Sequence, residues 1–354
     1  MEKRKHDIDK DFTSIILMIE ESRDRAYRKV NEELVLLYFE VGKIVSNKVI
    51  QGVWGERTVD ELAKYIEIKL PALSGFNRRG LYRMKQFYET YTSSEFVSTL
   101  LTQMKSSENE VIVFVSALLT QIQWSSHLHI MSKTKTVEEK LFYLHLAIND
   151  KLSVRDLERQ LNTGVFERTL LAKTKVTPLL TQIQKTIFKD PYIFEFLELP
   201  IGHSEKDLEK ALILNLQKFI VELGRGFTYM GSQHRLQVGN KDYYTDLLFF
   251  HRDLQCLVLF ELKIQEFEPE FLGKLNFYLE TLDRDVKRPH ENPSIGILLC
   301  KGKDTEVVEY AMARNASPAI IADYETKLIS KEVLANKLHQ LAEELSDFRT
   351  NEKE

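Results

Sequence analysis

The stretch Leu257-Val258-Leu259-Phe260-Glu261-Leu262-Lys263-Ile264 predicts a β-strand that carries two charged residues. Its other residues are apolar and rich in strand formers, which is typical of a strand covered on both faces of a sheet. Residues two apart on a strand point to the same face, so Glu261 and Lys263 should lie side by side in a dry environment. Because an unpaired buried carboxylate is strongly unfavourable, these charges need a partner.

Asp246 is the predicted partner, since it lies on a second predicted strand over residues 243–250. Residues 251–253 turn that strand back as a hairpin, which brings Asp246, Glu261 and Lys263 to one point of the sheet. Two carboxylates at one point repel each other, and a divalent cation relieves the repulsion. The alternative is a structural charge cluster at a strand end that binds no metal.

The regions around this hairpin divide the chain into two kinds of pattern. Residues 1–165 predict helices over about 11–45, 58–68, 77–91, 116–131, 137–150 and 153–161. The first helix has helix-period apolar positions that include Ile15, Ile16 and Ile19, and Ser153 followed by Asp156 is a helix-start pattern. Two helix–turn–helix candidates result, over 62–87 and 141–161. Residues 166–203 form a transition with Pro178, Pro191 and Pro200 as breakers.

Residues 204–354 change to alternating helices and strands, so the whole chain is of the α+β class. We expect a helix over 207–223, strands over 227–238, 243–250 and 255–264, and a helix over 268–282. A strand over 294–300, a helix over 305–314, a strand over 319–322 and a closing helix over 330–348 follow. The core order is αβββαβ, and we expect a mixed central sheet.

Nearly the whole chain resembles one family. The pattern Asp-(x14)-Glu-x-Lys on adjacent strands, together with αβββαβ order, is similar to the active site of the PD-(D/E)XK nuclease superfamily. The chain resembles the YhcG-type family of bacterial nucleases within it. The matching blocks are Trp54-Gly55 and residues 75–88, 119–127, 153–160, 222–227 and 295–301.

The resemblance implies a restriction-endonuclease-like fold for residues 204–354 and roles for particular residues. Asp246, Glu261 and the backbone carbonyl of Leu262 would hold Mg²⁺ or Mn²⁺, and Lys263 would position the attacking water or stabilise the phosphate. Glu209, on the helix before the first strand, would be a further metal-supporting acid. The alternative for Glu209 is a solvated acidic face, since Glu205, Asp207 and Glu222 are near it in the sequence.

Three further residues are candidates for a supporting role. Gln233 lies on the first strand of the sheet, although a strand glutamine is also common at a surface. Related enzymes often carry Gln-x-x-x-Tyr on the next helix, and here Lys274 replaces the glutamine while Tyr278 matches. A lysine can grip a phosphate as a point charge, so this departure leaves activity open.

The N-terminal half resembles a winged-helix-like domain that binds DNA or a protein partner. Its candidate nucleic-acid contacts are basic residues that flank a predicted helix, namely Arg78, Arg79, Arg83 and Lys85. Such side chains suit phosphate contact and groove insertion. A solvated basic face is the alternative.

Composition agrees with a nuclease without pointing to one. The 354 residues carry a net charge of −4, divided into +2 for residues 1–200 and −6 for residues 201–354. No apolar run is long enough to span a membrane and no apolar leader opens the chain, so we expect a cytoplasmic protein without a membrane partner. Cys256 and Cys300 fall in predicted strands and should be buried packing residues.

These observations predict an enzyme, a Mg²⁺-dependent nuclease that hydrolyses phosphodiester bonds of DNA, with a role near mobile or foreign DNA suggested by the family. The alternatives are a non-catalytic DNA-binding or assembly protein with a relic nuclease fold, and a helix–turn–helix regulator. A homodimer, a larger homo-oligomer and a protein partner of the N-terminal domain all remain open.

Overall fold

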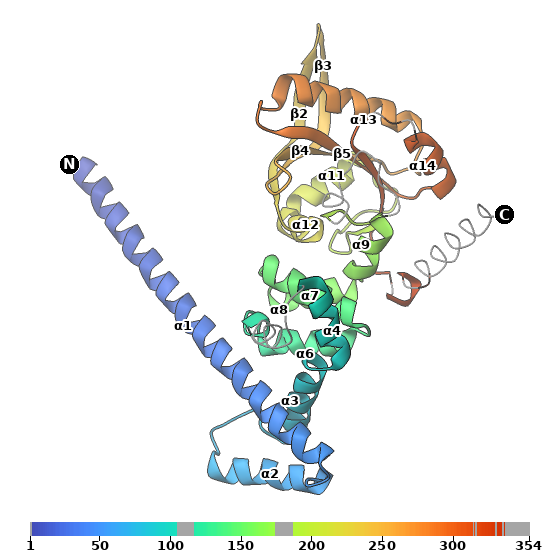
Figure 1. Cartoon of the computed structure of the whole chain (residues 1–354). Coiled ribbons are helices and arrows are strands. Elements are labelled where there is room, and N and C mark those ends of the chain that lie inside the picture. The colour runs from blue at the N-terminus through green and yellow to red at the C-terminus, as the bar shows by residue number, and fades with distance from the viewer. Residues whose placement is uncertain are drawn as a thin grey trace, which may run out of the picture. The chain divides into compact units, whose positions relative to one another are not determined.

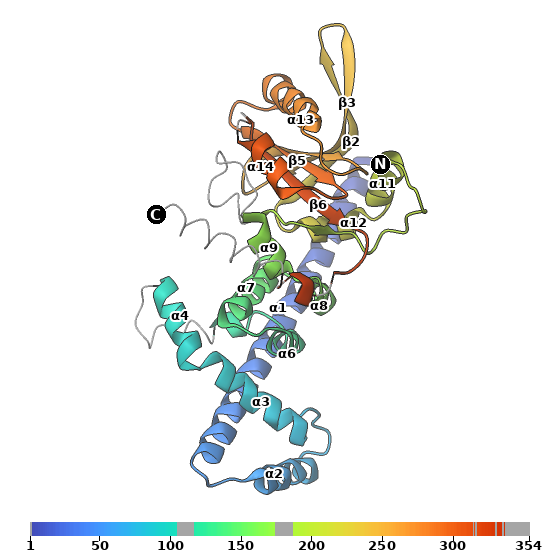
Figure 2. The same cartoon turned by 90° about the vertical axis from the view of Figure 1, so that its right-hand side faces the viewer.

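The computed structural model divides the chain into two compact units, Met1–Glu158 and Arg159–Glu354. It describes residues 2–104, 117–173, 187–313, 315, 317–329, 331–334 and 336. Figures 1 and 2 show the chain in two views turned by 90°. Within the described residues, no helix is both long enough and apolar enough to cross a membrane.

The first unit is helical throughout its described part. Its helices are α1 (Glu2–Ile50), α2 (Glu56–Lys69), α3 (Arg78–Tyr91), α4 (Ser94–Met104), α6 (Trp124–Lys133), α7 (Val137–Asn149) and α8 (Val154–Asn162), which ends in the second unit. The second half of α1 packs on α2 and α3 through a core that includes Tyr38, Val45, Leu81 and Met84. Residues 2–104 and 117–158 contain no strand, so the helical prediction is confirmed and the winged-helix detail is not.

A local sequence pattern explains where α8 begins. Ser153 Oγ accepts a hydrogen bond from the backbone N–H of Asp156 and donates one to its carboxylate, which confirms the predicted helix start. The single helix expected over 116–131 is wrong, because residues 120–123 leave the helical conformation before α6. At that break the carbonyl groups of Thr120 and Ile122 accept hydrogen bonds from Asn31 of α1, a long-range contact that no local pattern contains.

The second unit is built on a mixed six-stranded sheet. Its strands are β1 (Tyr192–Ile193), β2 (Phe227–Val238), β3 (Lys241–His251), β4 (Cys256–Leu262), β5 (Asn292–Cys300) and β6 (Ala319–Glu325). The order is β1-β6-β5-β4-β3-β2, with β2, β3 and β4 antiparallel and the other neighbours parallel. The expected mixed sheet is therefore confirmed, and β1 is an additional strand that the sequence did not indicate.

Helices cover both faces of this sheet (Figure 1). The helices α11 (Glu205–Leu214) and α12 (Leu216–Leu223) pack on one face, against the side chains of Val258, Phe260 and Leu262. The helices α13 (Glu270–Thr281) and α14 (Thr305–Met312) pack on the other, with the π-helical turn η1 (Leu282–Val286) after α13. A side chain at Gly296 of β5 would meet Leu275 of α13 at 2.9 Å, so glycine there permits close helix–sheet packing.

One helix prediction in this unit is wrong, and another lies mostly outside the described residues. The helix expected over 207–223 is two helices, because Asn215 leaves the helical conformation between α11 and α12 (φ −108°, ψ 30°). The closing helix expected over 330–348 is observed only at residues 331–334 and 336, and the rest lies outside the described residues. Cys256 and Cys300 are buried and free, as expected.

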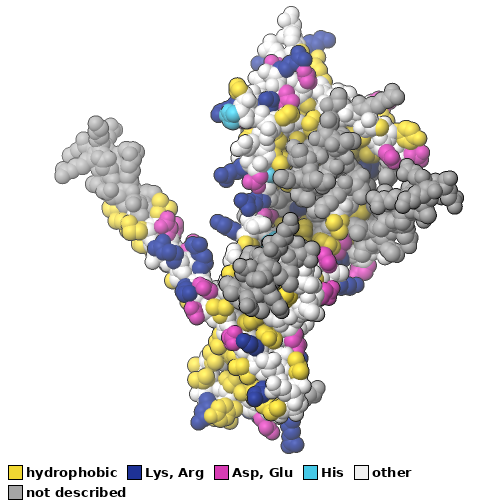
Figure 3. Space-filling view, in the orientation of Figure 1, with side chains coloured by type: hydrophobic (Ala, Val, Ile, Leu, Met, Phe, Trp, Pro, Cys, Tyr) yellow, Lys and Arg dark blue, Asp and Glu magenta, His cyan; other side chains and the backbone are white. Residues whose placement is uncertain are grey.

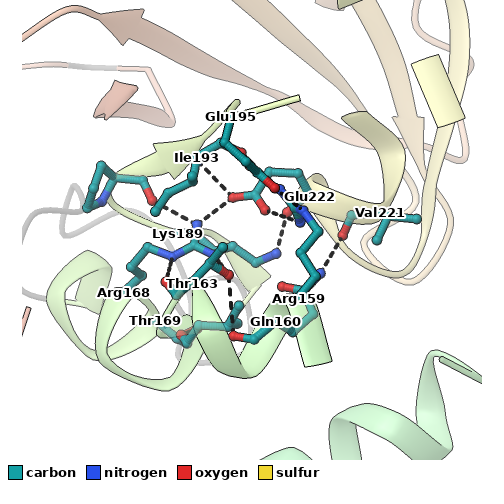
Figure 4. A network of polar contacts seen from close by, with 12 residues as sticks. Arg159, Gln160, Thr163, Arg168, Thr169, Lys189, Ile193, Glu195, Val221 and Glu222 are labelled. Atoms are coloured by element: carbon teal, nitrogen blue, oxygen red, sulfur yellow. Dashed lines mark hydrogen bonds and ion pairs between the residues drawn. The ribbon is translucent and has the colours of Figure 1, made fainter. Parts of the chain in front are cut away.

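The predicted transition, residues 166–203, contributes ordered elements to the second unit. The helix α9 (Val165–Lys173) lies there, and Phe188, Tyr192 and Phe194 are fully buried in the core beside α11 and α12. A buried polar network joins these elements (Figure 4), in which Arg168 and Arg159 both donate to the carboxylate of Glu222. The second compact unit therefore begins at Arg159, while the predicted domain boundaries at 165 and 204 stay predictions.

Candidate active site

The antiparallel pairing of β3 with β4 brings the first two predicted site residues together. Leu247 pairs with Phe260, so Asp246 and Glu261 stand at the next step of the ladder. The Oδ2 atom of Asp246 accepts a hydrogen bond of 2.8 Å from the backbone N–H of Leu262. The hairpin geometry therefore places both carboxylates at the point that the sequence predicted.

Glu261 is buried on the sheet face that α13 covers, with no exposed surface. Its Oε1 atom accepts hydrogen bonds from Lys263 Nζ at 3.2 Å and from Lys274 Nζ at 2.5 Å. Its Oε2 atom is buried without a hydrogen-bond partner in the described part of the chain. Since a buried carboxylate oxygen is strongly unfavourable when unpaired, this atom has coordination capacity that the protein itself does not fill.

Asp246 is half-buried, and its charge is disfavoured. Burial, and after it the charge of Glu261, raises the pKa of Asp246 to about 6, although the Leu262 N–H and the lysines act in the opposite direction. Two carboxylates this close favour a shared proton or a bound cation. A divalent cation would hold both in the charged form.

Lys263 follows directly after β4 and is almost fully buried. Besides Glu261, its ammonium donates to the backbone carbonyl of Leu262 at 3.0 Å and to Glu205 Oε2 at 3.3 Å. It also lies 5.6 Å from the ring centre of Phe271 on α13. Glu205, at the start of α11, was noted in the sequence only as part of an acidic helix face, and its contact with Lys263 depends on how α11 packs on the sheet.

Lys274 reaches the site from α13. Burial acts to lower the pKa of Lys274, but the hydrogen bond to Glu261 and the nearby negative charges together outweigh it and raise the pKa. Its ammonium lies 5.3 Å from the ring centre of Tyr278, one turn further along α13, whose own pKa burial raises. Lys274 therefore takes the position of a neutralising cation on Glu261.

Glu209 and Gln233 form a second layer beside the carboxylates. Gln233 Nε2 donates a hydrogen bond of 2.8 Å to Glu209 Oε2. Burial raises the pKa of Glu209, and the charge of Glu261 raises it further. Gln233 also has a positive φ of 49°, a conformation that a non-glycine residue rarely adopts in a strand. The solvated alternative for Glu209 does not describe this buried, hydrogen-bonded side chain.

The donor set fits a divalent cation of the Mg²⁺ type. Mg²⁺ is usually held by one or two carboxylates and keeps several waters, and Asp246, Glu261 and the Leu262 carbonyl supply two carboxylates and one carbonyl. Within the described residues, no three or more His, Cys, Asp or Glu side chains gather as a closed metal cage. The Oε2 atom of Glu261, which has no hydrogen-bond partner among the described residues, is available to coordinate such a cation. The Leu262 carbonyl accepts a hydrogen bond from Lys263 in this structure.

The four basic residues predicted to contact nucleic acid lie on α3 of the first unit, whereas the carboxylates lie on β3 and β4 of the second unit. Arg78 pairs with Asp60 at 2.9 Å and lies over the ring of Tyr82, and Lys85 pairs with Glu89 at 2.8 Å. Arg79 is exposed and Arg83 partly exposed. The connection between α2 and α3 runs through residues 70–77, longer than the three- or four-residue turn of a helix–turn–helix.

The sheet, its helices and the paired carboxylates define a nuclease domain of the PD-(D/E)XK type. Comparison with known sequences agrees, since residues 185–339 match the model of the YhcG PDDEXK nuclease domain and residues 14–168 match the DUF1016 N-terminal domain. The chain is 31% identical over 346 residues to "Putative nuclease YhcG" of Escherichia coli (strain K12), a match that covers 92% of each chain. The chain therefore belongs to the YhcG family, as its sequence predicted.

The match to solved structures is much weaker. A structure titled "Structure of EndoMS-dsDNA2 complex" is 17% identical, with a TM-score of 0.27, over 37% of this chain. A repair endonuclease from Pyrococcus abyssi is 14% identical, with a TM-score of 0.24, over 36% of this chain. The matched region spans about half the length of each, 48%. A likeness of this strength says nothing about activity.

Proposed function

We propose that the protein is a divalent-metal-dependent nuclease that hydrolyses phosphodiester bonds of DNA at Asp246 and Glu261. The observation that carries the proposal is the fully buried Glu261 carboxylate, whose Oε2 atom has no hydrogen-bond partner among the described residues and stands beside Asp246. A buried carboxylate oxygen without a hydrogen-bond partner is unfavourable unless it binds a ligand or takes part in catalysis. Membership of a nuclease family supports the same interpretation.

In this proposal, the carboxylates of Asp246 and Glu261 and the carbonyl of Leu262 hold Mg²⁺ or Mn²⁺. When bound, such a cation supplies Lewis-acid stabilisation of the charge that develops on the phosphate. Lys263 then turns its ammonium toward the attacking water or a non-bridging phosphate oxygen. Gln233 orients Glu209 toward the carboxylates, and Lys274 and Tyr278 line the α13 side of the site. DNA is the proposed substrate, and a role near mobile or foreign DNA stays a prediction.

The test is a cleavage assay with the full chain. Duplex DNA, single-stranded DNA and RNA are incubated with Mg²⁺, with Mn²⁺, or with EDTA, and products are resolved on denaturing gels. We expect cleavage that depends on the divalent cation. The cleavage rate of Glu261→Gln should be lower by about a hundredfold or more, since removing one charge-stabilising group of an active site has an effect of that order. The matched control is Glu268→Gln, an exposed glutamate seven residues further on. Equal cleavage by Glu261→Gln and wild type would refute the site.

A second function, DNA binding without catalysis, is favoured by one specific observation. Lys263 and Lys274 both donate to Glu261 Oε1, so this carboxylate is paired with two ammonium groups without any metal. A relic nuclease fold could be stabilised in this way. Wild-type protein that binds DNA in gel-shift titrations, yet cleaves none of the three substrates with either metal, would support this second function over the first.

A further inference from the structure

One side of α1, over residues 12–44, is apolar, and the described residues of its own unit leave it exposed. Every side chain from Ile15 to Val30 is exposed, although the row includes several of the most apolar residue types. Large apolar side chains recur at spacings of three, four, seven or eight, which keeps them on one side of a helix. These residues, called here the apolar stripe of α1, are Phe12, Ile16, Ile19, Tyr27, Val30, Leu34, Leu37 and Ile44.

The stripe is large enough to hold two chains together. Its members are between 36% and 66% exposed, and hydrophobic side chains are visible along α1 in the space-filling view (Figure 3). At about 80 to 90 Å² apiece, the eight side chains expose about 700 Å², close to the roughly 800 Å² that each partner buries in a standard protein interface. An isolated amphipathic helix gains most of its stability from such packing, so the stripe needs a cover.

Charge argues against a membrane surface as that cover. Residues 2–30 contain eight Lys or Arg against seven Asp or Glu, so this part of α1 is close to neutral. Helices that lie on anionic lipid usually present an excess of Lys and Arg on their polar face. A near-neutral helix with an apolar side is instead typical of helix–helix association.

We infer that the apolar stripe of α1 binds the same stripe of a second copy of this chain in an antiparallel pair. Arg23 lies in line with the stripe, and a parallel pair in register would place it against Arg23 of the second copy. An antiparallel pair that sets Ile19 opposite Leu37 instead sets Arg23 opposite Glu33, since the position numbers across such a pair have a constant sum. Two identical contacts between opposite charges then form, as a two-fold interface requires.

The association is tested on the full chain by sedimentation velocity over a range of micromolar concentrations. Wild type is expected to sediment as a dimer of twice 41.4 kDa. The double variant Ile16→Glu/Ile19→Glu should be a monomer, because dimerisation through the apolar stripe would remove the introduced carboxylates from water. The matched control Leu17→Glu/Met18→Glu changes two residues of the same helix, 53% and 61% exposed, that lie off the stripe, and it should remain a dimer.

Helix content of each variant is measured by circular dichroism, so that loss of α1 itself is recognised. The orientation is tested by charge reversal. Arg23→Glu alone should weaken the dimer, and Arg23→Glu combined with Glu33→Arg should restore it. A monomeric wild type, or a control variant as monomeric as the stripe variant, would overturn the proposal. Failure of the double charge reversal to restore a weakened dimer would overturn the antiparallel pairing.

Discussion

Replacing Glu222 by glutamine should destabilise the second unit more than any surface change, because of what the substitution leaves behind. Glu222 is fully buried on α12, and its carboxylate pairs with Arg168, which is also fully buried, and with Arg159 (Figure 4). The backbone N–H of Ile193 also donates to this carboxylate, at 3.0 Å. Removing one partner of a buried pair leaves an uncompensated charge and destabilises by about 3 to 5 kcal/mol.

For a unit of this size, a loss of about 3 kcal/mol lowers the melting temperature by roughly 6 to 12 °C. Calorimetry of the full chain measures that shift, and hydrogen exchange of peptides from β4 and β5 assigns it to the second unit. The matched control is Glu195→Gln, whose carboxylate pairs with the same Arg159 but is 22% exposed. The control should lose only about 1 kcal/mol. An equal effect of the two substitutions would refute the reasoning.

The same carboxylate predicts how stability depends on pH. Burial acts to raise the pKa of Glu222, but the charges of Arg168, Lys189 and Arg159 outweigh it and lower the pKa to about 2. A depressed carboxyl pKa contributes stability that is fully present above about pH 4.5 and is lost as pH falls through about 2. The difference corresponds to about 3 kcal/mol. Acid titrations followed by hydrogen exchange should show this loss in wild type, and Glu222→Gln should lack it.

Three further outcomes concern the candidate site and the basic helix. Saturating Mg²⁺ should raise the melting temperature of wild type, by a stabilisation of about 2.7 kcal/mol at a hundred times the dissociation constant, and should do so less in Asp246→Asn; equal shifts would place the metal elsewhere. Lys274→Gln removes a cation that competes for Glu261, so calorimetric titration should show Mg²⁺ binding about fivefold tighter, corresponding to about 1 kcal/mol, and unchanged affinity would contradict competition. Replacing Arg78, Arg79 and Arg83 of α3 together should weaken DNA binding in gel shifts and flatten its salt dependence, because fewer counterions are released. An unchanged dependence of affinity on salt concentration would make the helical unit a protein-interaction module.

Much of the fold was determined by local sequence pattern. The alternation and apolar runs of residues 227–262 fixed three neighbouring strands, since side-chain period and turn residues are properties of a few consecutive positions. The same pattern identified Glu261 and Lys263 as charged residues within a buried strand. Antiparallel pairing of the two strands then required Asp246 to lie beside them. Helix starts such as Ser153 were predictable for the same reason.

Only the tertiary structure decided which distant residues meet. The two-residue strand β1 is too short to carry a period, and it exists because β6, more than a hundred residues later, supplies its hydrogen bonds. Glu222 appeared in the sequence as one acid of a helix, whereas folding surrounds it with cations from residues 159–189. Glu205 meets Lys263 through the packing of α11. The apolar positions of α1 were visible in the sequence, but their exposure was not, because burial depends on what the rest of the chain leaves uncovered.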